Sequence, residues 1–293
     1  MNIIKLNDNY QIPQIGYGTW KIQPEDAEKL ILEAIEVGYR HIDTAQVYNN
    51  EWEIGLALKK ADRLQLFLTT KIWLPNFNNE HVFFTSIKQS LKRLNVDYVD
   101  LLLLHWPVKG KIISTYKWLE KAKDLGLTKS IGVSNFMINH LQEILAIAKY
   151  KPAINQIEFQ PLVQQKKLVK FCKDNNIAVT GYSNIRSYIN NEISDVEKNV
   201  LEKIAHEVNK SVPEVILRWV YQEGIIIIPK SSHRERMKIN TNIVNFTLSS
   251  LQMEQIRKLD RNDYTKADEI YEGKLWANDT LKAKNFLFDK HFK

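Results

Sequence analysis

The residues of this chain best suited to chemistry are Asp43, Tyr48, Lys71 and His105. Lys71 lies at the end of an apolar run, and a lysine buried there must pair with an anion, for which Asp43 is the natural candidate. A phenolate is stabilised beside a buried ammonium, so we expect the pKa of Tyr48 to fall below its usual ~10. Tyr48 could then donate a proton near neutral pH, and a neutral His105 could donate a hydrogen bond to a carbonyl oxygen. The set is suited to polarising a carbonyl group and protonating the alkoxide that forms when a hydride arrives.

Short apolar runs alternate along the chain with longer segments of helical periodicity. Each run is predicted to be a strand, and the eight runs are IGYGTW (15–20), HIDTA (41–45), QLFLTTKIW (65–73), VDLLLLHW (99–106), KSIGVSNF (129–136), AINQIE (153–158), IAVTGYS (177–183) and GIIIIPKS (224–231). Nearly continuous apolar runs are typical of parallel strands that are covered on both faces. The run of four leucines ends in His105 and Pro107, which places a titratable group at the rim of the core.

The segments between the runs have apolar residues at helical spacing. In 24–37, Pro24 suits the first turn of a helix and Gly38 its end. Further helices are predicted over 79–94, about 115–125, 137–149 and 164–175, and over 195–222 in two pieces that divide near Pro213. Eight strand–helix units in a chain somewhat longer than ~250 residues predict an α/β fold, the (β/α)8 TIM barrel, as a single domain over 1–293.

A doubly wound sheet is the alternative fold. A dinucleotide-binding sheet of that kind needs the motif G-x-G-x-x-G after its first strand. Here 16-GYG-18 is followed by Trp20 and Lys21, and no third glycine arrives. The segment around 7-NDN-9 predicts an N-terminal β-hairpin that caps the barrel floor. We expect the C-terminal tail from Tyr264 onward to fold over the barrel mouth, with Trp276 inside it.

Catalytic residues of a TIM barrel lie at the carboxyl ends of its strands. The alternation of His41 and Asp43 could therefore belong to a metal site that activates water. Such a site needs further His or Asp ligands at other strand ends, where Ser134, Gln156 and Lys230 stand instead, so no metal is predicted. The plainest alternative to a catalytic role is a buried ion pair with two unrelated polar residues nearby.

Six motifs occur in a fixed order along the chain: 38-GYRHIDTAQVYNNE-51, 69-TTKIW-73, 104-LHWP-107, 131-IGVSNF-136, 155-NQIE-158 and 228-IPKS-231. In this combination the chain resembles the aldo-keto reductase family over nearly its whole length. The motif DTAQVYNNE and the short connection after His105 are most similar to the bacterial branch that includes 2,5-diketo-D-gluconate and methylglyoxal reductases.

The resemblance implies a role for each matching residue. Tyr48 would be the proton donor, Asp43 and Lys71 would tune it, and His105 would orient the carbonyl group. The implied cofactor is NADPH. The residues implied to bind it are Gly18, Thr19, Trp20, Asp43, Ser134, Asn135, Gln156, Tyr182, Ser183, Lys230, Ser231, Arg236 and Asn240.

Within the implied cofactor site, three groups of residues have different tasks. Ser134, Asn135 and Gln156 would hold the nicotinamide carboxamide, and Tyr182 would stack on the nicotinamide ring. The 2′-phosphate would be bound by Lys230, Ser231 and Arg236. The last assignment also follows from residue types, because Lys, Ser and Arg after the eighth strand form a phosphate site where such barrels often have one.

The chain departs from the family pattern at two places. The family usually has R-x-x-E-N after the phosphate lysine, whereas this chain has 236-RMKIN-240, so Ile239 replaces a glutamate that would contact adenine. We therefore expect looser adenine binding. Tyr182-Ser183 is usually followed by Pro-Leu and is followed here by Asn184-Ile185-Arg186, where Arg186 could bind a phosphate itself.

Aromatic residues dominate the predicted substrate site. Its residues are Trp20, Tyr48, Trp73, His105 and Trp106, all of which come at or just after predicted strand ends. Aromatic walls exclude water and favour small carbonyl compounds with some apolar surface. The alternative for each tryptophan is packing at the barrel rim. Since the loop 107–114 is short, we expect an open mouth.

Composition limits the other classes of function. The chain is 44% hydrophobic and 26% charged, as in soluble globular proteins, and its N-terminus has no run long enough for a signal peptide. No stretch approaches the roughly 20 apolar residues that span a bilayer, and the one cysteine, Cys172, suits a reducing cytoplasm. The net charge of +7 includes a basic cluster at 230–238 without a nucleic-acid-binding motif. We expect a cytoplasmic monomer with a small-molecule partner and no nucleic-acid or membrane partner.

The sequence thus predicts an NADPH-dependent reductase of small aldehydes and ketones, such as methylglyoxal or 2,5-diketo-D-gluconate. The alternative from another class is an NADPH-binding regulatory or structural module on the same fold with little turnover. The complete set of Asp43, Tyr48, Lys71 and His105 argues against that alternative.

Overall fold

A computed structural model describes residues 2–261 of the chain. Its centre is a sheet of parallel strands whose order in space follows their order in the chain. The strands are β3 (Tyr17–Gly18), β4 (His41–Asp43), β5 (Phe67–Ile72), β6 (Val99–Leu104), β7 (Thr128–Ser134), β8 (Ile154–Glu158), β9 (Ala178–Tyr182) and β10 (Ile226–Ile227). Ile15 pairs with Ile227 in parallel, which joins the first strand to the last. The sheet is therefore closed, and the predicted (β/α)8 barrel is confirmed.

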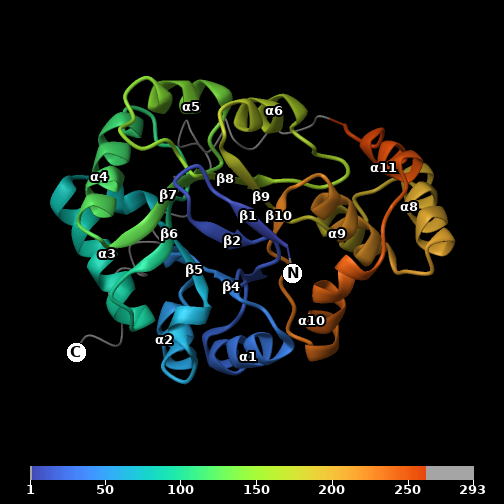
Figure 1. The fold of residues 1–293 in the computed structure, drawn as a ribbon, viewed down its shortest axis with the longest axis horizontal. Coiled ribbons are helices and arrows are strands. Elements are labelled where there is room, and N and C mark those ends of the chain that lie inside the picture. The colour runs from blue at the N-terminus through green and yellow to red at the C-terminus, as the bar shows by residue number, and fades with distance from the viewer. Residues whose placement is uncertain (1, 262–293) are drawn as a thin grey trace.

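Helices surround the barrel on all sides (Figure 1). They are α1 (Pro24–Val37), α2 (Glu51–Leu58), α3 (Glu80–Leu94), α4 (Ile112–Asp124), α5 (Ile138–Leu145), α6 (Lys166–Asp174), α7 (Arg186–Ile189), α8 (Asp195–Glu207), α9 (Val212–Gln222), α10 (Arg234–Thr241) and α11 (Ser250–Arg257). The short 3-10 helices are η1 (Gln46–Tyr48), η2 (Arg63–Gln65), η3 (Leu74–Phe77) and η4 (Asn242–Asn245). All the predicted helices are present, and α2, α7, α10 and α11 are additional.

The ends of two helices show how closely local sequence sets the boundaries. Helix α1 has the predicted bounds, and Gly38 ends it with φ 113°, a left-handed conformation that favours glycine. Pro213 lies in the first turn of α9, where a missing backbone N–H costs nothing. The Ser211 side chain caps that turn, so the expected division of 195–222 occurs because a new helix starts there.

The N-terminal hairpin closes the floor of the barrel (Figure 1). Strands β1 (Ile3–Lys5) and β2 (Gln11–Pro13) pair in antiparallel fashion. Leu6 and Ile12 of this hairpin are buried in one cluster with Phe67, Leu101 and Ile226 of the barrel strands. The predicted cap is thus confirmed, whereas the expectations for the tail from Tyr264, including Trp276, concern residues outside the described part.

Strand alternation separates the two faces of the barrel wall. In β6, Leu101 and Leu103 belong to the cluster inside the barrel, while Leu102 and Leu104 pack on the side of the helices. His105 is next in the inward series. The same alternation turns Asp43 and Lys71 inward, because their neighbours in the chain, Ile42 and Ile72, pack outward against the helices. Across residues 2–261, no helix is long and apolar enough to cross a membrane.

Candidate active site

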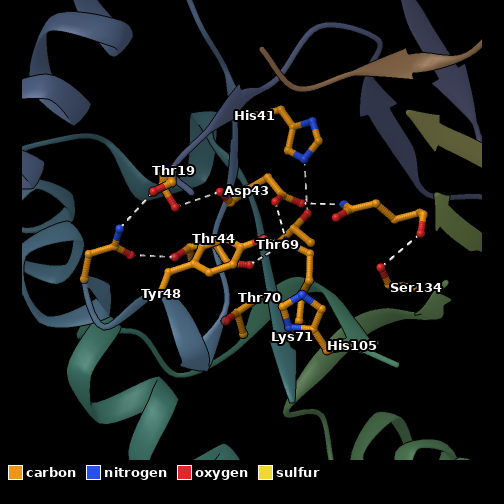
Figure 2. Close-up of polar contacts among 12 residues, drawn as sticks. Thr19, His41, Asp43, Thr44, Tyr48, Thr69, Thr70, Lys71, His105 and Ser134 are labelled. Atoms are coloured by element: carbon orange, nitrogen blue, oxygen red, sulfur yellow. Dashed lines mark hydrogen bonds and ion pairs between the residues drawn. The ribbon is translucent and has the colours of Figure 1, made fainter. Parts of the chain in front are cut away.

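A buried ion pair lies at the carboxyl ends of β4 and β5 (Figure 2). The Lys71 Nζ atom donates to Asp43 Oδ1 at 2.5 Å and to the Thr44 carbonyl oxygen at 2.9 Å. The two charged side chains are 0% and 1% exposed. Burial lowers the pKa of Lys71, but the charge of Asp43 and the contact with Tyr48 outweigh it, so the pKa lies above its ordinary value. Lys71 is therefore a permanent cation in this site.

Tyr48 lies beside this cation at the end of η1, the turn between β4 and α2. Its hydroxyl oxygen accepts a hydrogen bond from Lys71 Nζ at 3.3 Å. Burial raises the pKa of the Tyr48 hydroxyl more than Lys71 lowers it, so the pKa lies above its ordinary value. The expected fall of this pKa was wrong, because desolvation of the phenolate outweighs the nearby charge. The hydroxyl keeps its proton at neutral pH and is available as a donor.

His105 lies opposite Tyr48 at the end of β6. Its ring centroid is 5.8 Å from that of Tyr48 and 5.0 Å from that of Trp73. Burial, followed by the charge of Lys71, lowers the pKa of His105 well below its ordinary value. Within residues 2–261 the Nδ1 atom of His105 has no hydrogen-bond partner. His105 is thus a neutral imidazole with unused hydrogen-bonding capacity beside the tyrosine.

Amide and hydroxyl side chains continue the site across β7 and β8. Gln156 Nε2 donates to the second carboxylate oxygen of Asp43 at 2.7 Å, so both oxygens of that carboxylate are satisfied. Ser134 Oγ donates to the Gln156 carbonyl oxygen at 3.0 Å. Gln156 therefore also orients Asp43, a contact that the sequence did not indicate.

Asn135 extends this network towards β9. Its amide nitrogen donates to the His105 carbonyl oxygen and to Ser134 Oγ, each at 3.0 Å. The Tyr182 hydroxyl donates to Asn135 Oδ1 at 2.7 Å. Ser183, the next residue, has a left-handed backbone with φ 56°. The structure thus brings together the four residues expected to hold a carboxamide and to stack on its ring.

The predicted phosphate site lies where β10 leads into α10. Lys230 and Arg236 are exposed, and in the described part of the chain Arg236 has no acidic partner, whereas the neighbouring Arg234 pairs with Glu36. Ser231 is buried, and its hydroxyl oxygen accepts from the His233 backbone N–H at 3.0 Å. The cations and the helix start form a suitable place for an anion.

Asn240, the last residue expected at this site, lies deeper in the fold. It is half-buried close to the Tyr39 hydroxyl, which donates to the Met237 carbonyl oxygen at 3.3 Å. Ile239, where the family has a glutamate, is 41% exposed. Asn240 therefore lies beside a buried tyrosine, and Ile239 offers no polar group to a base.

Gly18 and Thr19 are buried at the end of β3. A Cβ atom on Gly18 would lie 2.4 Å from the Ile228 carbonyl oxygen, so only glycine fits where the first and last strands meet. The Thr19 hydroxyl donates to the Asp43 carbonyl oxygen at 3.0 Å. Both residues thus hold the rim of the barrel in shape beneath Trp20.

The three expected tryptophans differ in their surroundings. Trp20 is 52% exposed, and its ring centroid is 4.9 Å from that of Tyr48. Trp73 is buried against His105. Trp106 is half-buried next to His105 in the chain. Trp20 and Trp73 therefore flank the Tyr48–His105 pair as walls.

Asn50 and Glu51 follow Tyr48 closely in the chain and were not singled out by the sequence. Buried Asn50 accepts from the Thr44 hydroxyl at 3.0 Å and donates to the Thr19 carbonyl oxygen at 3.0 Å. Buried Glu51 accepts from Arg93 Nη2 at 2.7 Å. The only available signal was their nearness to Tyr48 in the motif AQVYNNE.

Arg186, the second departure from the family pattern, begins α7. Its guanidinium lies 2.9 Å from Glu158 and 3.5 Å from Glu192. Asn184 in the same loop donates to the Phe159 carbonyl oxygen at 2.8 Å. The cation of Arg186 is therefore already balanced by carboxylates, which does not favour the phosphate contact considered for it.

Comparison with known proteins agrees with this geometry. The family model described as "Aldo/keto reductase family" matches residues 14–261. The chain belongs to the aldo/keto reductase family. It is therefore an oxidoreductase, as the ordered motifs predicted.

Relatives of known name cover nearly the whole chain. A glyoxal reductase of Bacillus subtilis (strain 168) is 39% identical over 263 residues, 89% of this chain and 93% of the relative. A methylglyoxal reductase, DkgA of Yersinia pestis, is 37% identical over 262 residues, 88% of this chain and 92% of the relative. The predicted similarity to the branch with methylglyoxal reductases is thus confirmed.

A solved structure of the family shares the fold. The Bombyx mori aldo-keto reductase in complex with NADP has a TM-score of 0.83 and 30% identity, over 92% of this chain and 96% of that chain. This similarity covers the barrel and the strand ends that carry the site described above.

Proposed function

We propose that this protein reduces small aldehydes and ketones to alcohols with NADPH, with Tyr48 as the proton donor. The observation that carries the proposal is the contact of the Tyr48 hydroxyl with Lys71 Nζ at 3.3 Å, while Lys71 is paired with Asp43. A protonated tyrosine, a fixed cation and a neutral histidine in one place are what protonation of an alkoxide requires.

The donor set fits the proposed cofactor at two separate places. Ser134, Asn135 and Gln156 present neutral hydroxyl and amide groups, which match the donors and acceptors of a carboxamide. Lys230 and Arg236 present cations near the start of α10, which match a phosphate. When bound, NADPH would supply the hydride, which the side chains of the site cannot supply.

Each residue of the catalytic set has a distinct task. The neutral His105 would donate a hydrogen bond to the substrate carbonyl oxygen and orient it towards Tyr48. The Tyr48 hydroxyl would give its proton to that oxygen as negative charge develops there. Lys71 would stabilise the phenolate left behind, and Asp43 would keep Lys71 in place and charged.

The substrate class is a small carbonyl compound with apolar surface beside its reacting group. Trp20 and Trp73 flank the Tyr48–His105 pair, and such aromatic walls would help to exclude water from a bound substrate. The similar proteins named glyoxal reductase and methylglyoxal reductase support a 2-oxoaldehyde as the first candidate. 2,5-Diketo-D-gluconate is the second, from the motif DTAQVYNNE.

A panel assay tests the proposal. The purified protein is mixed with NADPH or NADH and with methylglyoxal, glyoxal, 2,5-diketo-D-gluconate or an aromatic aldehyde, and loss of the reduced nicotinamide absorbance is followed. We expect turnover with NADPH and at least one of the small dicarbonyl compounds. Tight NADPH binding without turnover of any compound would refute the proposal and favour the regulatory or structural module instead.

A further inference from the structure

Gln46 connects the turn that carries Tyr48 to the segment that carries Trp73. It is the first residue of η1, which ends at Tyr48. Its Oε1 atom accepts from the Trp73 backbone N–H and from Asn76 Nδ2, each at 2.8 Å. Strand β5 ends one residue earlier, at Ile72, and Gln46 supplies an acceptor for the backbone N–H of Trp73 just beyond the strand.

The other end of the Gln46 amide is anchored to α3. Its Nε2 atom donates to the Ser86 carbonyl oxygen at 3.2 Å, to Ser86 Oγ at 3.3 Å and to Ser90 Oγ at 3.1 Å. The Trp73 N–H can only donate and the Ser86 carbonyl can only accept, so these two backbone groups fix which way the amide points. Neither an apolar residue nor a carboxylate can satisfy both.

This bridge links the Trp73 wall of the site to the proton donor Tyr48. The Trp73 ring lies 5.0 Å from that of His105, and the Tyr48 ring lies 5.8 Å from the same histidine. The side chain of Gln46 holds the backbone of Trp73, while its own backbone continues into Tyr48. A change at Gln46 would therefore alter the spacing between the aromatic wall and the proton donor.

We propose that Gln46 is a positioning residue that sets the place of Trp73 relative to the Tyr48 hydroxyl, and thereby the size of carbonyl compound that the site accepts. The inference rests on the proposed reductase function. It assigns to Gln46 no contact with substrate or cofactor.

Two variants of Gln46 and one matched control test the inference. Gln46→Leu removes both ends of the bridge, and Gln46→Glu keeps the acceptor but removes the donor. The control is Gln14→Leu at the barrel floor, since Gln14 is also buried and donates to the carbonyl oxygens of Tyr221 and Ile225 at 2.8 and 3.2 Å. For each variant, kcat and KM are measured with methylglyoxal and an aromatic aldehyde, and the NADPH Kd by fluorescence titration.

We expect Gln46→Leu to lower kcat/KM for methylglyoxal about tenfold and that for the bulkier aldehyde less, because a loosened wall misplaces the small substrate most. Gln46→Glu should shift the ratio of the two kcat/KM values in the same direction. The NADPH Kd should stay within about twofold of the original value, since the bridge lies among groups that do not bind the cofactor. In Gln14→Leu the ratio should be unchanged despite its loss of stability. An unchanged ratio in a folded Gln46→Leu protein would overturn the inference.

Two further measurements keep the outcome decisive. If Gln46→Leu does not fold, Gln46→Glu still removes the donor to Ser86 and Ser90, and an unchanged ratio in that variant overturns the inference. If the original protein reduces no carbonyl compound, the proposed function fails, and crystal structures of the original protein and Gln46→Glu decide the positioning role alone. A Trp73 backbone that has not moved relative to Tyr48 would then contradict it.

Discussion

The Lys71→Met variant should unfold much more easily than the original protein. Lys71 and Asp43 are 0% and 1% exposed, and without Lys71 the Asp43 carboxylate keeps, among residues 2–261, the side-chain donor of Gln156 at 2.7 Å. Removal of one partner of a buried ion pair costs about 3–5 kcal/mol because the other charge remains buried. At roughly 2–4 °C per kcal/mol for a large domain, we expect Tm to fall by about 6–20 °C.

The assay is urea unfolding for the free energy and thermal unfolding for Tm, both followed by circular dichroism, with Lys170→Met as the control. Lys170 pairs with Asp174 on α6, but the two side chains are 76% and 57% exposed, so its loss should cost at most about 1 kcal/mol. In the double variant Asp43→Asn with Lys71→Met, neither charge of this pair remains, and we expect much of the stability to return without any carbonyl reduction. A Lys71→Met protein no less stable than Lys170→Met would show that the loss of Lys71 leaves no costly buried charge.

The remaining predictions concern the cofactor and pH. Arg236→Ala should weaken NADPH binding about tenfold, as expected for loss of a charge-assisted contact, with little change for NADH; an equal loss for both cofactors would argue against a phosphate site there. Burial lowers the pKa of His41 to about 4. Unfolded His41 takes up a proton below pH ~6.5 while the folded form stays neutral, so stability is complete above that pH and falls by ~3 kcal/mol as the pH drops towards 4. His41→Gln should flatten this slope in urea unfolding measured between about pH 7 and pH 4.5; a slope as steep as in the original protein would contradict the assignment.

Patterns along the chain predicted the barrel because each strand carries its own signal. The apolar runs are long, and the inward positions of β4, β5 and β6 follow from alternation once the strand ends are known. Helix α2 was missed because Gly55 in its middle weakens a helical pattern. The structure supplies the reason for that glycine, since a Cβ atom would lie 2.1 Å from the Arg93 carbonyl oxygen.

Two features of the site depended on distances that a single sequence does not contain. The direction of the Tyr48 pKa depends on how completely its hydroxyl is buried, and the sequence shows only that Lys71 could be near. In the sequence Gln46 resembles any polar loop residue, because its partners Ser86 and Ser90 lie some forty positions away on α3. Residues that act through long-range hydrogen bonds become visible only when the chain is folded.

The Tyr48→Phe variant tests whether Tyr48 gives its proton to the substrate oxygen. This change removes one hydroxyl, whose contact with Lys71 Nζ is 3.3 Å long, and leaves the ring in place. We expect kcat for methylglyoxal to fall about 10²–10⁴-fold, the usual contribution of a general acid, while the NADPH Kd stays the same. Turnover by Tyr48→Phe at a rate close to that of the original protein would mean that Tyr48 is not the proton donor.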